Sequence, residues 1–390
     1  MNKEQLDKIQ DLLDTMINTR FTAGASCLVF QGGTEQGYYE AGFASLENEI
    51  PFRRDTICHM FSMSKPITSA AVMLLLGDGR LDLLQPLSEI LPAFAHPLVV
   101  DSDGSGLIPS PKEVTIRDLL GMTSGYTYGG TADAGRLMTS KLFRETALRM
   151  EKNPLTTMEF MDRLAEIPLS FIPGASFEYG LSADILGAVV EAVSGQKFSS
   201  FLKEHIFDPL RMEDTGFYVP SEKQPRLAKI YTQVPGTLFT DTNLAISNDM
   251  LTPPAFESGG AGIVSTIDDY MRFNRMLLGC GSLDGVKILA PGTVKFMHAQ
   301  GLNPVQQAAF DTALPQLSGY TYGNLMRVMV HPELALSAAS AGEYGWDGWL
   351  GTYMMVDPAN DLTVVFLMQR TDSGTTTFTR RLRNILYSAL

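Results

Sequence analysis

The stretch that most constrains this chain is 68–76, because it ends in seven consecutive apolar residues. A helix this apolar on all sides is buried rather than amphipathic, so it has to lie inside a sizeable core. A second apolar run, 57–61, comes shortly before it. Between the two runs stand Ser62 and Lys65, whose spacing of three puts them on one face of the helix's first turn. The fold therefore has to hold a hydroxyl and an amine together beside its core.

This pair has a known chemical use. A serine hydroxyl is a poor nucleophile until a base takes its proton, and a lysine desolvated by apolar neighbours loses its preference for the charged form. The pattern S-x-x-K occurs in acylating serine enzymes, and a helix N-terminus nearby would suit a developing oxyanion. The four residues alone are equally compatible with a structural reading, in which Ser62 only caps the helix.

Overall composition excludes several classes of protein. The chain has 390 residues, 45% hydrophobic and 19% charged, which is ordinary for a globular protein of two domains or one domain with an insertion. The net charge of −13 argues against a nucleic-acid partner. The sequence has no apolar run of about 18 residues for a membrane span and no signal-peptide core, so we expect a cytoplasmic location.

The cysteines and histidines indicate no metal or disulfide chemistry. Cys27, Cys58 and Cys280 are far apart in apolar settings, which predicts buried, reduced thiols. No H-E-x-x-H pattern is present and the five histidines are isolated, which argues against a zinc hydrolase. The absence of G-x-S-x-G argues against the nucleophile turn of an α/β-hydrolase. We therefore expect neither a metal nor another cofactor.

Strand patterns at both ends and helical patterns between them predict an α/β (α+β) fold. We expect an antiparallel sheet flanked by helices, formed by 1–76 and 280–390, with a mostly helical inserted domain at 77–279 and the active site between them. Surface-loop composition marks 101–111. Predicted strands cover 25–31, 37–44, 320–330, 353–356 and 362–368, and predicted helices cover 1–20, 135–167, 183–193, 197–207, 266–278 and 376–390.

Two later stretches could serve the Ser62–Lys65 pair. Tyr179 stands before a predicted helix, and beside a lysine ammonium its phenolate would be favoured. The stretch 344–352 (YGWDGWLGT) precedes a predicted hairpin, and its glycines permit close backbone approach to a substrate. Asp184, one turn beyond Tyr179, is predicted to be a structural hydrogen-bonding group.

In this order and at these intervals, the three stretches resemble those of serine hydrolases related to class C β-lactamases and D,D-peptidases, above all their esterase-type members. LLGMTSG at 119–125 and SGGAGIVST at 258–266 resemble two further segments of that family, so the resemblance covers nearly the whole chain. It implies a β-lactamase-like fold and an acyl-enzyme on Ser62, with Lys65 as its partner and Tyr179 as the proton-shuttling base. It also implies an oxyanion hole made by the backbone N–H groups of Ser62 and Trp349.

The chain departs from the family pattern in two motifs. The usual Tyr-x-Asn is Tyr179-Gly180-Leu181, and the usual Lys-Thr-Gly is Trp346-Asp347-Gly348. A lysine there would hold an anionic carboxylate, which tryptophan cannot do, so we expect little β-lactamase activity. Both changes favour small neutral esters or amides, with an apolar portion packed on aromatic side chains. The predicted substrate-binding residues are Trp346, Gly348, Trp349, Tyr126 and Tyr128.

The sequence therefore predicts a carboxylesterase that cleaves a small-molecule ester through an acyl-enzyme. A D-stereospecific amidase or peptidase, a weak β-lactamase and an acyltransferase remain open within the family, as does a non-catalytic binding module on the same fold. Trp346 and Trp349 are also compatible with plain core packing, and Tyr126 and Tyr128 with loop packing. The sequence does not determine an oligomeric state.

Overall fold

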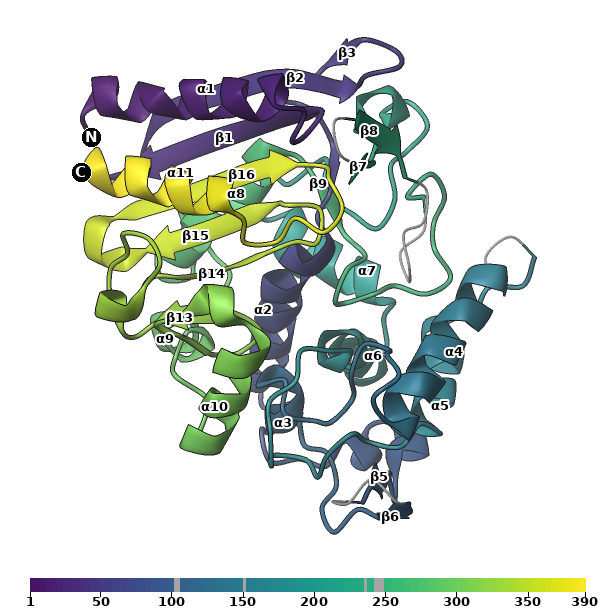
Figure 1. The fold of residues 1–390 in the computed structure, drawn as a ribbon. Coiled ribbons are helices and arrows are strands. Elements are labelled where there is room, and N and C mark those ends of the chain that lie inside the picture. Colours follow the sequence, from purple (N-terminus) through teal and green to yellow (C-terminus); the bar gives the residue numbers. More distant parts are fainter. Residues whose placement is uncertain (102–105, 150–151, 235–236, 242–248) are drawn as a thin grey trace.

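An eight-stranded antiparallel sheet forms the framework of the computed structural model, which describes residues 1–101, 106–149, 152–234, 237–241 and 249–390 (Figure 1). This confirms the predicted fold class. In spatial order, the strands are β12 (Tyr320–Tyr322), β13 (Arg327–Met329), β14 (Tyr344–Asp347), β15 (Tyr353–Asp357), β16 (Leu362–Met368), β1 (Gly24–Gln31), β2 (Thr34–Ser45) and β3 (Ile50–Pro51).

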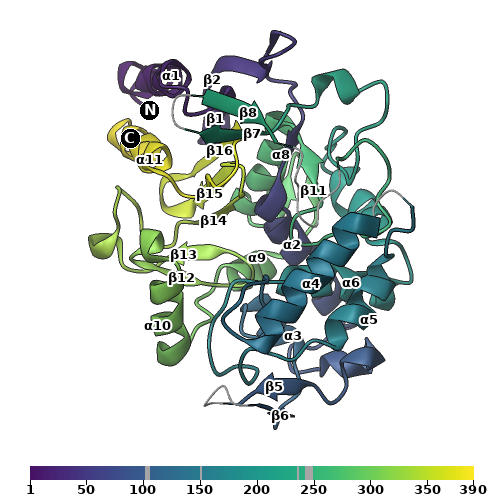
Figure 2. The ribbon, with the colours of Figure 1, turned by 45° about the vertical axis from the view of Figure 1, so that its right-hand side comes forward.

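The two ends of the chain meet in the middle of this sheet. Strand β1 pairs with β16 over seven residues, from Ala25 opposite Met368 to Gln31 opposite Leu362. Every residue of β16 is buried, because helices cover the sheet on both faces. Helices α1 (Lys3–Asn18) and α11 (Thr377–Ser388) lie side by side on one face, and α8 (Ile267–Leu278) lies on the other (Figures 1 and 2).

Helix α1 shows why these segments form where they do. Leu6, Ile9, Leu12, Leu13 and Met16 recur at helical spacing and are all buried against the sheet. Its first turn is capped by the Asn2 side chain, which accepts a hydrogen bond from the Gln5 N–H. Threonine side chains cap α8 and α11 in the same way. Local sequence, through the amphipathic pattern and the caps, thus determines the helices that cover the two faces of the sheet.

Helix α2 (Ser64–Gly77) is the buried helix that the sequence predicts, and it lies between the sheet and the helical part of the chain (Figure 2). It contacts α6 (Ser182–Ser194), α9 (Pro291–Met297) and β14. The remaining described helices are α3 (Ile116–Leu120), α4 (Ala134–Arg149), α5 (Thr157–Ala165), α7 (Phe198–Leu202) with a π-helical turn at Lys203–Phe207, and α10 (Pro304–Ala313). The domain boundaries at 76/77 and 279/280 stay a prediction.

Four two-stranded pairs complete the described secondary structure, and one of them matters for the site. Strand β4 (Cys58–His59) pairs with β9 (Val264–Ser265), so the run before Ser62 is fixed against the segment that follows the glycine cluster at 258–262. The other pairs are β5 (Leu98–Val100) with β6 (Leu107–Pro109), β7 (Tyr231–Val234) with β8 (Thr237–Thr240), and β10 (Ser282–Leu283) with β11 (Val286–Lys287).

Four predictions from the sequence were wrong in detail. The continuous helix expected at 135–167 is two helices, α4 and α5, and the described residues 152–156 between them, which include Pro154, are not helical. The single strand expected at 320–330 is a hairpin of β12 and β13, because Gly323 donates to the carbonyl of Met326 and Leu325 adopts φ 63°. The surface loop expected at 101–111 contains β6, while its residues 102–105 lie outside the described part of the chain. Cys27 and Cys58 are buried free thiols, but Cys280 is exposed because it follows the end of α8.

No helix in the described part of the chain combines the length and apolar character needed to cross a bilayer.

Candidate active site

Ser62 lies in a tight 3-10 turn, Phe61–Met63, immediately before α2. Phe61 adopts φ 46°, an unusual left-handed conformation for a bulky residue, and its ring packs edge-on against Trp349 at 5.3 Å. The cap position of α2 is Met63, which makes no side-chain cap bond. The alternative in which Ser62 merely caps the helix is therefore wrong, and its partly exposed hydroxyl faces other partners.

Lys65 connects the elements of the site. Its Nζ donates to Ser62 Oγ at 3.1 Å, to the Tyr128 hydroxyl at 3.0 Å and to the Gly260 carbonyl at 2.9 Å. The side chain is fully buried, and this desolvation lowers the pKa of Lys65 to about 7, against the opposing charges of Asp184 and Asp347. A lysine with that pKa is largely neutral just above pH 7 and can accept the proton of Ser62.

Tyr179 reaches the same hydroxyl from the segment before α6. Its own hydroxyl accepts a hydrogen bond from Trp346 Nε1 at 2.9 Å and forms one with Ser62. The Lys65 Nζ lies 4.6 Å from the centre of the Tyr179 ring. Burial raises the pKa of Tyr179 well above its usual value, and the hydrogen bonds with Ser62 and Trp346 only partly oppose this. This direction runs against the expectation that the phenolate is favoured, because a raised pKa favours the neutral phenol.

The third stretch brings backbone groups to Ser62. Gly348 has no space for a side chain, because a Cβ would lie 2.2 Å from Thr352 Oγ1 and 2.5 Å from the carbonyl of Met60. Its N–H donates to the carbonyl of Thr352 at 2.7 Å, whereas the Trp349 N–H has no acceptor among the described residues. The Trp349 ring is partly exposed, and its Nε1 donates to Asp372 Oδ1 at 2.8 Å.

The predicted aromatic residues separate into three different roles. Tyr128 joins the cluster of Ser62, Lys65 and Tyr179 through its bond to Lys65, a contact that sequence reasoning missed. Trp346 is 3% exposed, and its indole positions Tyr179 while it packs edge-on against Tyr322 at 5.1 Å. Tyr126 is not brought into the cluster, because it packs in the core edge-on against Phe94 at 5.5 Å.

The glycine cluster at 258–262 holds Lys65 from the other side. The Gly260 carbonyl accepts from Lys65, and the Gly260 N–H donates to Asp184 Oδ1 at 3.2 Å, while Ser258 Oγ also donates to that oxygen. Asp184 is thus the structural hydrogen-bonding group that the sequence predicts. A side chain at Gly260 would collide with Asp184 at 2.6 Å, which is the physical reason for glycine there.

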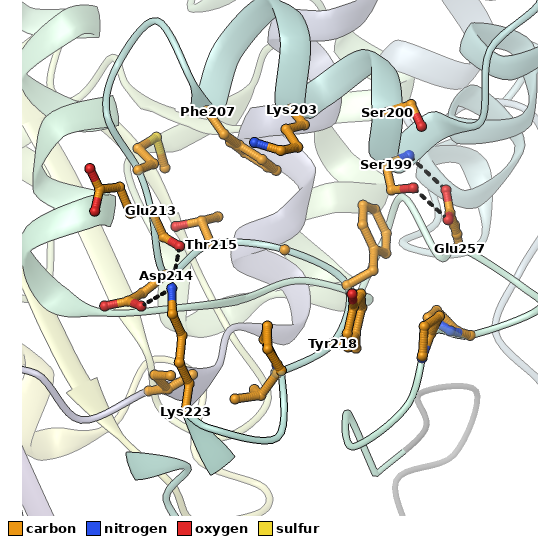
Figure 3. A pocket seen from close by; sticks show the side chains of 18 of the residues that line it. Ser199, Ser200, Lys203, Phe207, Glu213, Asp214, Thr215, Tyr218, Lys223 and Glu257 are labelled. Atoms are coloured by element: carbon orange, nitrogen blue, oxygen red, sulfur yellow. Dashed lines mark hydrogen bonds and ion pairs between the residues drawn. The ribbon is translucent and has the colours of Figure 1, made fainter. Parts of the chain in front are cut away.

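Two cavities bear on where a ligand could lie. A hollow of about 630 Å³ adjoins Tyr179 and is lined by the 177–179 segment and by the small side chains of α10, including Ala308, Ala309 and Ala313. Another cavity, of about 440 Å³, lies among Ser199, Lys203, Phe207, Tyr218, Lys223 and Glu257 (Figure 3). Ser62, Lys65 and Tyr179 are not among the residues that line it.

No cluster of three or more histidine, cysteine, aspartate or glutamate side chains suited to a metal occurs among the residues that the structure describes.

Comparison with known proteins agrees with this geometry. The family model described as "Beta-lactamase" matches residues 9–388. Protein Rv1367c of Mycobacterium tuberculosis is 30% identical over 376 residues, which cover 93% of this chain and 90% of that protein. Esterase EstB of Burkholderia gladioli is 29% identical, covering 98% of this chain and 95% of that protein. The structure of EstCE1, described as a hydrolase with promiscuous acyltransferase activity, superposes with a TM-score of 0.83 at 25% identity, with 99% of both chains covered.

Proposed function

This chain belongs to the beta-lactamase family and is a serine hydrolase of its esterase type, and from that premise we propose that it is a carboxylesterase of small neutral esters. One observation carries the proposal: a fully buried lysine, with its pKa lowered to about 7, has its Nζ within hydrogen-bond distance of Ser62 Oγ, at 3.1 Å. A neutral lysine beside a partly exposed serine is an activated nucleophile rather than a structural pair.

Acylation of Ser62 follows from these positions. Neutral Lys65 takes the hydroxyl proton as Ser62 Oγ attacks the ester carbonyl, and the resulting oxyanion accepts hydrogen bonds from the N–H groups of Ser62 and Trp349. The bond to the alcohol then breaks. Tyr179, a neutral phenol, gives its proton to the departing oxygen and recovers one from the Lys65 ammonium. The alcohol leaves, and the acyl group remains on Ser62.

Deacylation uses the same groups in reverse. Water attacks the acyl carbonyl, its proton passes through Tyr179 to Lys65, and the carbon–oxygen bond to Ser62 breaks with return of the proton to the serine. The products are one carboxylic acid and one alcohol for each ester and water consumed. Tyr128 and Gly260 hold the Lys65 amine in place through both steps: the two N–H groups of the neutral amine donate to them while its lone pair faces Ser62 Oγ, and the ammonium donates to all three.

The surroundings favour an uncharged, partly apolar acyl or alcohol group. The hollow beside Tyr179 is lined mostly by apolar side chains, those of Phe177, Leu314 and the alanines of α10, together with Glu178 and Thr312. Trp346 occupies the position at which related hydrolases carry the anion-binding lysine, and its indole is engaged with Tyr179. Both features disfavour a substrate carboxylate there.

Hydrolysis of p-nitrophenyl acetate and butyrate tests the proposal. We expect Ser62→Ala to lose more than about 10³-fold in kcat, because no nucleophile remains. Ser64→Ala is the matched control: Ser64 lies two residues on and only accepts from the Ile263 N–H, so most activity should remain. A fluorophosphonate probe should add to Ser62 in the wild type and in Ser64→Ala. Equal rates for wild type and Ser62→Ala would disprove the proposal.

Acyl transfer is the second candidate, and one observation favours it. The amine of Lys65 and the ring of Trp346 are buried, whereas Ser62 is partly exposed, so an alcohol as well as water has access to an acyl group on Ser62. EstCE1 is described as having promiscuous acyltransferase activity. Added alcohols that raise p-nitrophenol release, and yield the new ester by mass spectrometry, would establish transfer. Hydrolysis alone at high alcohol concentration would exclude it.

A further inference from the structure

The glycine cluster at 258–262 lies between helices α2 and α6. On the α2 side, Thr68 Oγ1 donates a hydrogen bond to the Gly259 carbonyl at 2.6 Å. On the α6 side, a Cβ added to Gly259 would lie only 2.3 Å from the carbonyl oxygen of Ala183. Both helices therefore contact the backbone of the cluster directly, and its peptide groups lie between the side chains that the two helices carry.

A continuous series of hydrogen bonds crosses this cluster from Lys65 on α2 to Asp184 on α6. Lys65 Nζ donates to the Gly260 carbonyl at 2.9 Å. The N–H at the other end of the same peptide group, that of Ala261, donates to Ser258 Oγ at 2.9 Å. Ser258 Oγ in turn donates to Asp184 Oδ1. We call this series the relay. Every donor in it points from the amine towards the carboxylate, so its bonds polarise one another.

The hydrogen bonds of Asp184 identify it as the negative end of the relay. Both groups bonded to its Oδ1, the Ser258 hydroxyl and the Gly260 N–H, are donors. Its Oδ2 has no hydrogen-bond partner among the described residues, so a proton on the carboxyl group would find no acceptor there. Burial raises the pKa of Asp184, and the charge of Lys65 and the two hydrogen bonds oppose this. Because Asp184 is fully buried, water screens its charge only weakly.

The proposed mechanism requires such a negative group. When Lys65 takes the proton of Ser62, a positive charge forms on a fully buried amine, which is unfavourable unless the charge is compensated. We propose that Asp184 is a positioning residue that stabilises this charge through Ser258 and the peptide group between residues 260 and 261. This inference rests on the proposed function, in which Lys65 is the base, and adds the group that supports that base.

The other titratable side chains that face Lys65 in the described part of the chain are Tyr128, Tyr179 and Asp347, and they lie outside the relay. Burial raises the pKa of both tyrosines, which favours their neutral forms. Asp347 Oδ2 accepts from Thr375 Oγ1 at 2.7 Å, and Asp347 acts on Lys65 only through its charge. Burial lowers the pKa of Lys65, and of the two carboxylates that oppose this, Asp184 has the larger effect.

The pH dependence of Ser62 labelling by a fluorophosphonate tests the relay. The labelling rate should fall at low pH as Lys65 becomes protonated, so the midpoint of this fall reports the basicity of the amine. Asp184→Asn should move the midpoint to lower pH by about one pH unit, because the ammonium loses its counter-charge. Ser258→Ala breaks the relay and keeps the carboxylate, so the midpoint should move in the same direction by less. The double variant should move it no further than Asp184→Asn alone.

Two matched variants control for the loss of an ordinary buried polar group. Ser69→Ala removes a buried hydroxyl from the helix that carries Lys65, where it donates to the Asn324 carbonyl at 2.9 Å. Asp118→Asn removes a buried carboxylate that caps α3. Both should lower stability and leave the midpoint at its wild-type pH. If the role of Asp184 is only structural, Asp184→Asn will behave in the same way, with slower labelling at every pH and an unmoved midpoint.

The outcomes separate the relay from the esterase function. An unmoved midpoint in folded Asp184→Asn overturns the inference, and where that variant does not fold, an unmoved midpoint in Ser258→Ala overturns it. A midpoint that moves in Asp184→Asn but not in folded Ser258→Ala also overturns the relay, because the charge alone would then act. An unmoved midpoint would leave Ser62-dependent ester hydrolysis, and with it the esterase, intact. If Ser62→Ala hydrolyses p-nitrophenyl butyrate at the wild-type rate, the esterase function fails and the inference fails with it.

Discussion

Replacing Lys65 by methionine should abolish activity and yet stabilise the protein. Burial lowers the pKa of Lys65 from 10.5 to about 7, so folding works against its charged form. That difference corresponds to about 5 kcal/mol at pH 7 and below. Methionine keeps a similar stem without the charge but loses three hydrogen bonds, each worth about 1 kcal/mol. The net expectation is a gain of about 2 kcal/mol at pH 7.

The pH dependence of this gain tests the reasoning independently of the lost hydrogen bonds. Above pH 7 the folded chain holds Lys65 neutral, while the unfolded chain keeps it protonated up to about pH 10.5. The wild type therefore gains stability relative to Lys65→Met as the pH rises, by about 2 kcal/mol between pH 7 and pH 9. Below pH 7 both states bind the proton, and the difference should level off.

Urea unfolding of both proteins at pH 6, 7, 8 and 9 measures this difference, with fluorophosphonate labelling as the readout of Ser62 reactivity. Lys295→Met, at an exposed position on α9, controls for the loss of a positive charge and should label normally. A stability difference that stays constant from pH 7 to pH 9 would refute the reasoning, as would Ser62 labelling at the wild-type rate in Lys65→Met.

Three further expectations follow from the same site. The profile of kcat/KM for p-nitrophenyl butyrate should fall below pH 7 as Lys65 becomes protonated; a flat profile down to pH 5 would contradict this. Tyr179→Phe should lose about 10²–10⁴ in kcat while remaining folded by circular dichroism, and near-normal turnover would exclude its role as proton donor. Gly348→Ala places a Cβ 2.5 Å from the Met60 carbonyl, so kcat should fall about 10²-fold. Gly292→Ala, where nothing lies within 4 Å, is its control.

Local sequence was enough to predict helices whose hydrophobic pattern lies within one continuous segment. The apolar run after Lys65 requires a buried helix, and α2 is that helix. The spacing of Leu6, Ile9 and Leu13 predicts the amphipathic α1. The prediction of a single strand at 320–330 was wrong, because a short turn interrupts the strand without changing the apolar composition on which the prediction rested.

The partners of Lys65 show where local patterns stop being informative. Tyr128 and Gly260 lie 63 and 195 residues away along the chain, and nothing in their own neighbourhoods marks them as acceptors for an amine. The twin tyrosines at 126 and 128 look alike in sequence, yet one enters the core and the other reaches Lys65. Their tertiary partners, Phe94 for Tyr126 and Lys65 for Tyr128, distinguish them.

The sequence by itself determined the fold class, the S-x-x-K pair and the loss of the anion-binding lysine, because these depend on residue identity and short spacing. The tertiary structure alone decided the pKa of the base. Segments distant in the chain shut the Lys65 amine away from water and lower its pKa to about 7, and burial also raises the pKa of Tyr179 above its ordinary value. Desolvation depends on everything that surrounds a group, so Lys65 becomes a base near neutral pH only once the chain has folded.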